Sequence, residues 1–241
     1  MKSYIYPLII LIILANYSCN KTDIDITGSP ASLNVINAVA GSNSDIIVNT
    51  TGKVLTYVDA SRINYFNYDG KYANGLLTFG LPQNKNVPIV VTLAKDSTKP
   101  VLSESLTCKS GEIFSLFVCG KPESVNYLLI RDTLNKITDS LTSIRVINLS
   151  QDISAISVNI AGHSIGSEIS RLNYKNITAF KSYPARAANN FYLFEFRDFN
   201  TGNLLATFLY NEIARFKHIT LVLRGLQDSY PGLEVVRINN W

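Results

Sequence analysis

Hydrophobic and polar residues along this chain follow the alternating pattern of half-buried β-strands. The clearest case is the segment 192–197, where Tyr192, Phe194 and Phe196 fall on one face and the residues between them fall on the other. Turn-forming residues separate such segments, and no helical periodicity persists beyond a turn or two. In the first half of the chain the pattern predicts strands at 33–38, 45–49, 54–58, 76–79, 88–94, 101–107, 113–119 and 127–131.

Four segments of the first half return in the second half, in the same order. SLNVIN at 32–37 returns as SIRVIN at 143–148, and RINYFN at 62–67 returns as RLNYKN at 171–176. IVN at 47–49 and SVN at 157–159 are each followed three residues later by a glycine, and IFSLFVCG at 113–120 matches HITLVLRG at 218–225. The shared order and similar spacing indicate a duplicated module.

Each copy reads as a series of short strands separated by turns within about 100 residues, which is typical of an immunoglobulin-like sandwich. We therefore predict an all-β fold with two tandem immunoglobulin-like antiparallel β-sandwich modules, at 32–134 and 143–241. A polar linker at 135–142 joins them. The duplication also predicts that the second module folds on its own.

The N-terminus has the pattern of a bacterial lipoprotein signal peptide. Lys2 precedes an unbroken Leu/Ile run at 8–14, too short to span a bilayer comfortably, and Cys19 follows directly after Ser18. We predict a signal peptide at 1–18, lipidation of Cys19 and a flexible tether at 19–31. The expected location is the cell envelope, on the outer membrane and facing either side of it, with the membrane as a partner through the lipid anchor.

The repeated segments also carry a resemblance to a known family. SIRVIN at 143–148, the VNxxG turn at 158–162, Leu172-Asn173-Tyr174 and ITLVLRG at 219–225 resemble the domain-of-unknown-function 4397 family of envelope lipoproteins. The chain departs from the family where Ala185 and Arg186 follow Pro184, since the family usually has a glycine there. The resemblance implies a β-sandwich in the envelope, and it implies no activity and no catalytic residues.

Composition narrows the function classes. The 241 residues are 46% hydrophobic and 17% charged, which suits a packed core, and the net charge of +4 comes without any Lys/Arg run. We therefore predict no nucleic-acid partner. The two histidines, His163 and His218, have no cysteine or carboxylate at ligand spacing, so we predict neither a metal site nor a cofactor, and we expect His218 to be partly exposed at the start of a strand.

Cysteine spacing gives a separate prediction. A hairpin turning at Ser110-Gly111 would pair Cys108 with Ile113 rather than with Cys119. We expect two separate buried thiols instead of a disulfide.

One motif offers an enzymatic alternative. Gly162-His163-Ser164-Ile165-Gly166 spells the GxSxG of a hydrolase nucleophile elbow, and Asp198 and His218 follow in the order that those enzymes use. The elbow needs a strand-to-helix turn in a large parallel sheet, however, and the repeat explains Gly162 as a hairpin turn. We predict that the protein has no catalytic residues and is not an enzyme, with a Ser164–His218–Asp198 hydrolase as the unfavoured alternative.

Aromatic residues give the remaining functional signal. Tyr65, Tyr68 and Tyr72 lie close together in one polar segment, and tyrosines beside Asn and Asp suit contact with a glycan or an envelope protein. We predict a non-enzymatic binding or scaffolding module with these three tyrosines as its ligand-binding candidates. A glycan-binding component of an uptake system and a structural spacer or adhesin stalk are the alternatives. A glycan site requires aromatics that cluster on one loop end, whereas a spacer requires aromatics that are scattered and buried.

Overall fold

The structure is a computed structural model that describes residues 29–42, 44–53, 61–66, 75–186, 191–211 and 213–240. Within these residues the chain forms sixteen β-strands, arranged in four sheets of four strands. No helix in this part of the chain is long and apolar enough to cross a membrane. The strand predicted at 54–58 lies outside the described residues.

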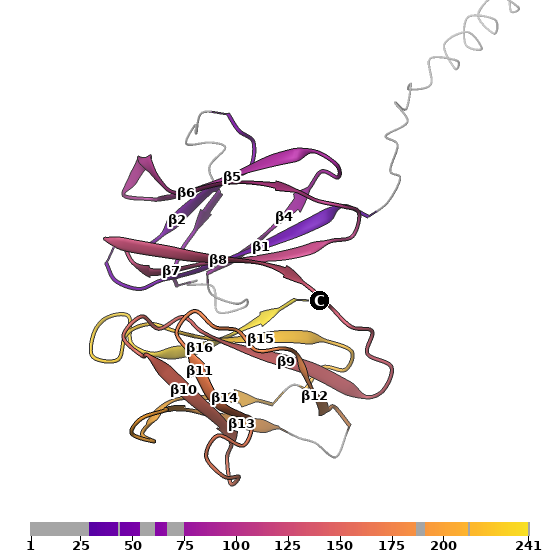
Figure 1. Ribbon diagram of the computed structural model, residues 1–241, viewed down its shortest axis with the longest axis vertical. Helices are drawn as coiled ribbons and strands as arrows, with labels where there is room; N and C mark the ends of the chain where they lie inside the picture. The colour runs from indigo at the N-terminus through magenta and orange to yellow at the C-terminus, as the bar shows by residue number, and fades with distance from the viewer. Residues whose placement is uncertain are drawn as a thin grey trace, which may run out of the picture.

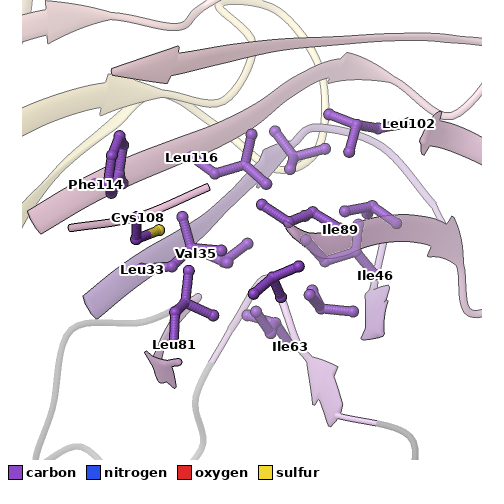
Figure 2. Packing of buried hydrophobic residues seen from close by; sticks show 14 of the residues in the cluster. Leu33, Val35, Ile46, Ile63, Leu81, Ile89, Leu102, Cys108, Phe114 and Leu116 are labelled. Carbon is purple, nitrogen blue, oxygen red and sulfur yellow. The ribbon is translucent and has the colours of Figure 1, made fainter. Parts of the chain in front are cut away.

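The first sandwich contains two sheets. One has the strand order β4-β1-β7-β8 and the other has the order β3-β2-β5-β6. Their bounds are β1 (Ala31–Val39), β2 (Ile46–Asn49), β3 (Ser61–Ile63), β4 (Leu76–Leu81), β5 (Asn86–Leu93), β6 (Asp96–Thr107), β7 (Ile113–Lys121) and β8 (Ser124–Asp132). Aliphatic side chains from both sheets, among them Leu33, Ile46 and Ile89, pack between them as the core shown in Figure 2.

The second sandwich repeats this arrangement. Its sheets have the strand orders β12-β9-β15-β16 and β11-β10-β13-β14. Their bounds are β9 (Leu141–Asn148), β10 (Ala155–Ile160), β11 (Ile169–Asn173), β12 (Lys181–Pro184), β13 (Tyr192–Asp198), β14 (Leu204–Tyr210), β15 (His218–Arg224) and β16 (Glu234–Asn239). The alternation predicted at 192–197 is confirmed, since Phe194 and Phe196 are buried in the core of this sandwich.

The prediction of an all-β fold with two sandwiches is confirmed, with one addition to the strand pairing. The first strand of each copy pairs in parallel with the seventh: β1 with β7, and β9 with β15. All other pairs of named strands are antiparallel. The two segments that repeat best, at the start and near the end of each copy, are therefore neighbours in space.

The two sandwiches are not separate bodies. Figure 1 shows four stacked layers, in which the sheet of β1 and β7 faces the sheet of β9 and β15. Between these inner sheets lies a third apolar cluster, here called the shared core, with residues from both copies: Ile36, Ala38, Phe117, Cys119, Ile147, Leu149, Val222, Val236 and Ile238. The central strands of the inner sheets are thus covered on both faces, which explains why every residue of β15 is buried.

The shared core bears on the prediction that the second module folds alone. Cutting the chain between β8 and β9 would expose the apolar side chains of both inner sheets to water. Because burial of apolar area is the main stabilising term, each half is expected to be less stable alone than within the chain. The structure has three apolar cores, one of them shared by the two sandwiches, and independent folding of the second module stays a prediction.

Buried polar side chains also connect the two sandwiches, next to the linker between β8 and β9. Arg145 of the second sandwich forms an ion pair with Asp132 of the first, with 2.8 Å between Nη2 and Oδ1, and both side chains are almost fully buried. Asn240 donates from Nδ2 to Oδ2 of the same carboxylate at 3.1 Å. These partners satisfy a charge that would otherwise be costly to bury, and they set the position of one sandwich on the other.

Candidate functional site

Tyr65, one of the predicted binding residues, is buried. Only 2% of its surface is exposed, and its ring lies under the guanidinium group of Arg224, 4.0 Å from the guanidinium carbon to the ring centre. The position of Arg224, 159 residues further along the chain, explains the burial. Tyr68 and Tyr72, the other two candidates, lie outside the described residues, as do Cys19 and the predicted signal peptide.

The segment that carries Tyr65 is fixed by hydrogen bonds to two side chains of the first sandwich. Asp45 accepts from the backbone N–H of Tyr65 at 3.1 Å and from Nε of Arg62 at 3.1 Å. Asn37 donates from Nδ2 to the carbonyl oxygens of Ser44 and Ile63, each at 3.0 Å. These bonds hold the loops after β1 and β3 together at one end of the sandwich.

A cleft of about 650 Å³ opens at this end, and we call it the distal cleft. Its aromatic wall consists of Phe66 from the first sandwich and Tyr230 from the second, with ring centres 5.8 Å apart. Tyr230 is 70% exposed. The remaining lining residues are mostly polar or charged: Gly41, Ser42, Ser44, Asp45, Arg62, Asn64, Tyr65, Ala94 and Lys95.

The distal cleft lies at the opposite end of β1 from Ser29, where the described part of the chain begins. The described chain enters β1 from Ser29, and Gly41 and Ser42, just beyond the other end of this strand, line the cleft. A nine-residue strand spans about 30 Å. The cleft is thus separated from Ser29 by roughly the length of one strand.

The three residues of the hydrolase alternative are not brought together. Ser164 is exposed in the loop that follows the end of β10, where the turn predicted around Gly162 is present. Asp198 pairs with Ile156 near the start of β10, and its carboxylate accepts hydrogen bonds from the backbone of Asn200 and Thr201. His218 lies in the other sheet of this sandwich, beside Ser143. Each of these groups thus has a separate structural role.

His218 is buried rather than partly exposed, which corrects the sequence prediction. Only 5% of its surface is exposed, and its ring packs edge-on against Phe180 with 5.1 Å between ring centres. Its strand, β15, lies inside an inner sheet between β9 and β16. Among the described residues, no group of three or more His, Cys, Asp or Glu side chains could hold a metal ion.

The two cysteines behave as predicted. Cys108 and Cys119 are free thiols and both are fully buried. Cys108 belongs to the core of the first sandwich and Cys119 to the shared core. Burial raises the pKa of each thiol, so neither is an activated nucleophile.

Two aromatic residues of the distal cleft differ in how far the sequence could identify them. Phe66 lies beside Tyr65 in the segment that carries the predicted tyrosines. Tyr230 was missed, although it stands before Pro231 and Gly232 in a turn, where an aromatic side chain is not needed for a core. Its distance in sequence from Phe66 hides their proximity.

These features define an all-β protein of two fused sandwiches with an aromatic cleft at one end. The sequence profile of a domain of unknown function, DUF4397, matches residues 31–159, which is more than half of the chain, and the chain therefore belongs to this family. The match covers the first sandwich and the start of the second, whereas the resemblance seen in the sequence was strongest in the second copy.

Comparison with individual known proteins gives no further information about function. No curated protein matches the chain. Among solved structures, it is similar to a carbohydrate-binding module of family CBM26, that of Eubacterium rectale Amy13K in complex with maltoheptaose. The likeness covers 85% of this chain and 95% of that one at 10% identity, with a TM-score of 0.26. At such a score it carries no argument about fold or ligand.

Proposed function

We propose that this protein is a non-enzymatic lipoprotein of the cell envelope that holds the distal cleft away from the outer membrane to bind a ligand. The sequence at Cys19 supports the anchor, because the cysteine follows a short apolar run and precedes a polar tether. The observation that carries the proposal is the pairing of Phe66 and Tyr230, one from each sandwich, at the end opposite the tether.

An oligosaccharide is the ligand class that the cleft fits best. An exposed aromatic ring such as that of Tyr230 can stack on the apolar face of a sugar, while Arg62, Lys95 and Asn64 offer hydrogen-bond donors around it. Exposed aromatics that are not needed for packing are a frequent mark of a binding surface. We expect no catalysis at this cleft, and its role is recognition.

Binding is tested by screening the purified mature chain against an oligosaccharide array and measuring the hits by calorimetry. Tyr230→Ala should weaken binding at least about tenfold, as expected for an aromatic residue at the centre of a contact. Phe191→Ala is the matched control, because Phe191 is another exposed aromatic residue of the second sandwich and lies outside the cleft. Equal affinities of the Tyr230 variant and the wild type would place the ligand elsewhere. A complete lack of hits would favour the spacer or stalk alternative.

Anchoring is tested separately. Cys19→Ala should release the protein from the membrane fraction or block its maturation, because the acyl chains are attached through this side chain. Cys108→Ala serves as the control for loss of a thiol. If Cys19→Ala and wild type fractionate and migrate alike, the lipid anchor is wrong, whatever the cleft binds.

A further inference from the structure

A second hollow adjoins the distal cleft, and we call it the side hollow. It has a volume of about 440 Å³, and four residues line both hollows: Gly41, Ser42, Lys95 and Tyr230. The remaining lining residues of the side hollow are Ala40, Lys121, Pro122, Glu123, Leu226 and Ser229. The exposed ring of Tyr230 therefore belongs to two adjoining hollows, which together offer a larger site than the distal cleft alone.

Backbone contacts hold the walls of the side hollow in place. The tight connection between β7 and β8, residues 121–124, forms one wall. The chain after β1 packs closely against this connection, since a Cβ at Gly41 would lie 3.2 Å from Cδ of Pro122. The wall from the second sandwich is a loop that is closed by a hydrogen bond from the backbone N–H of Leu226 to the carbonyl oxygen of Pro231, at 2.9 Å. The hollow is thus preformed, which lowers the ordering cost of binding a ligand.

The carboxylates that line the two hollows differ in whether protein groups already occupy them. Asp45 accepts from Nε of Arg62 and from the backbone N–H of Tyr65, each at 3.1 Å, so its charge is already balanced. Glu123 is exposed and forms no ion pair with a described residue. It is the one lining carboxylate that is free to repel an anion.

Two lysines provide positive charge that no described carboxylate neutralises. Lys95 is exposed in the turn between β5 and β6, and Lys121 is half-buried at the end of β7. Neither forms an ion pair with a described residue, and both line the side hollow. Because Arg62 is already paired with Asp45, these two free ammonium groups outnumber the free carboxylate of Glu123. The site therefore attracts a ligand of negative charge.

We propose that the distal cleft and the side hollow together bind an acidic oligosaccharide. Its carboxylate or sulfate groups accept hydrogen bonds from Nζ of Lys95 and Lys121, while a neighbouring sugar ring stacks on Tyr230. The inference rests on the proposed oligosaccharide binding and adds the charge of the ligand. An ammonium group acts as a point charge and takes either anion, whereas a neutral oligosaccharide gains the stacking without the charge-assisted hydrogen bonds.

The test uses the full mature chain as Cys19→Ala and two pairs of probes whose members differ in charge. Hexagalacturonate is compared with its methyl ester, and a κ-carrageenan hexasaccharide is compared with the same oligosaccharide after desulfation. By calorimetry at low salt, at least one charged probe should bind about tenfold more tightly than its neutral counterpart. High salt should remove most of this difference, because it screens charges at an exposed site. The pair that shows the difference identifies the anion as carboxylate or sulfate.

Charge-changing variants locate the anion. Lys95→Gln and Lys121→Gln should each weaken binding of the charged probe about three- to tenfold and leave the neutral probe unchanged. Glu123→Gln should strengthen binding of the charged probe about twofold, because it removes the free carboxylate. Lys85→Gln is the matched control, since Lys85 is an exposed lysine in the turn after β4, beside the start of β1 and outside both hollows.

The outcomes separate this inference from the proposed function. Equal affinities within both probe pairs, no binding of either charged probe, or charged-probe binding that both lysine variants leave unchanged would each overturn the inference. If neutral glycans still bind and are weakened by Tyr230→Ala, the proposed function stands without it. Binding of the charged probe that is lost in the lysine variants but unchanged in Tyr230→Ala would refute the stacking of a sugar, and with it both proposals.

Discussion

Arg224 and Tyr65 lie on different sandwiches, and the guanidinium carbon of Arg224 is 4.0 Å from the centre of the Tyr65 ring. The arginine is fully buried and donates to the carbonyl oxygens of Asn37, at 2.7 Å, and Tyr65, at 3.0 Å, while Glu234 accepts from its Nε at 2.9 Å. Arg224 of the second copy thus holds the segment around Tyr65 against β1 of the first copy.

A corresponding contact joins a tyrosine of the second copy to the seventh strand of the first copy. Tyr174 is the repeat equivalent of Tyr65, and its hydroxyl lies 3.7 Å from Sγ of Cys119, which is the repeat equivalent of Arg224. Each tyrosine therefore reaches the last residues of the seventh strand of the other copy. This is the contact pattern of a two-fold symmetric dimer, here enclosed in one chain.

Arg224→Met should lower the free energy of unfolding by about 2–4 kcal/mol, because it leaves two buried carbonyl groups without donors. Arg171→Met is the control, since Arg171 also stacks on a ring, that of Phe199 at 4.6 Å, but is exposed, and its loss should cost less than about 1 kcal/mol. Urea unfolding followed by circular dichroism measures both. Equal effects of the two substitutions would contradict the role given to Arg224.

The carboxyl group of Glu168 is expected to make the free energy of unfolding depend on pH. Burial would raise its pKa, but hydrogen bonds from Lys181 and Tyr183 outweigh this, and the pKa of the carboxyl is lowered. A carboxylate with a lowered pKa in the folded state stabilises above its unfolded pKa of about 4.3, and the contribution is lost as the pH falls through the folded value. The wild type should therefore exceed Glu168→Gln in unfolding free energy at pH 6, and the difference should vanish toward pH 3. Glu123→Gln, at an exposed position, should show no such convergence, and a constant difference for Glu168→Gln would refute the assignment.

The buried thiols predict a simple labelling pattern. Since burial raises the pKa of Cys108 and Cys119, iodoacetamide at pH 8 should leave both unmodified in folded Cys19→Ala protein and modify both in urea. Mass spectrometry of the intact chain counts the additions. Rapid labelling of either thiol under native conditions would show that its core opens readily.

Ser164 should have no chemical role. It is exposed in a turn, and Asp198 and His218 lie in different parts of the second sandwich. A serine-directed phosphonate should not label the protein, and Ser164→Ala should change its stability by less than about 0.5 kcal/mol. Stoichiometric labelling of Ser164 that is lost in His218→Ala would move the protein to the hydrolases.

The repeat and the local alternation were enough to predict the all-β fold and most strands of the first sandwich, because strand formation here follows from nearby residues. Cys108 was predicted to be unpaired from the geometry of one hairpin, and the alternation at 192–197 identified the buried rings of Phe194 and Phe196. The stacking of the two copies was not predicted. The sequence did indicate this stacking, because the residues at 113–119 and 219–223 form nearly continuous apolar runs. A strand with one face in water has alternating apolar and polar residues instead.

Exposure of individual side chains was harder to predict, because it depends on contacts between distant segments. Tyr65 looked exposed beside Asn64 and Asn67, but Arg224 covers it from the other copy. Tyr230 is distant from Phe66 in sequence, so the aromatic wall of the cleft could not be assembled from spacing. Arginine is rarely fully buried, and composition alone would place Arg224 on the surface.

The central claim is that the two sandwiches form one cooperative body, on which the distal cleft depends because residues of both sandwiches line it. Its most direct test places a substitution in the core of one sandwich and reads the effect in the other. Val158→Ala, in the core of the second sandwich, should cost about 2 kcal/mol, and Cys108 in the core of the first provides a thiol that reacts only on opening. In a Cys19→Ala, Cys119→Ala background, the urea midpoint for labelling of Cys108 should fall with Val158→Ala by the same amount as the circular dichroism midpoint. A Cys108 midpoint unchanged by Val158→Ala would mean that the sandwiches unfold independently, and would contradict the account.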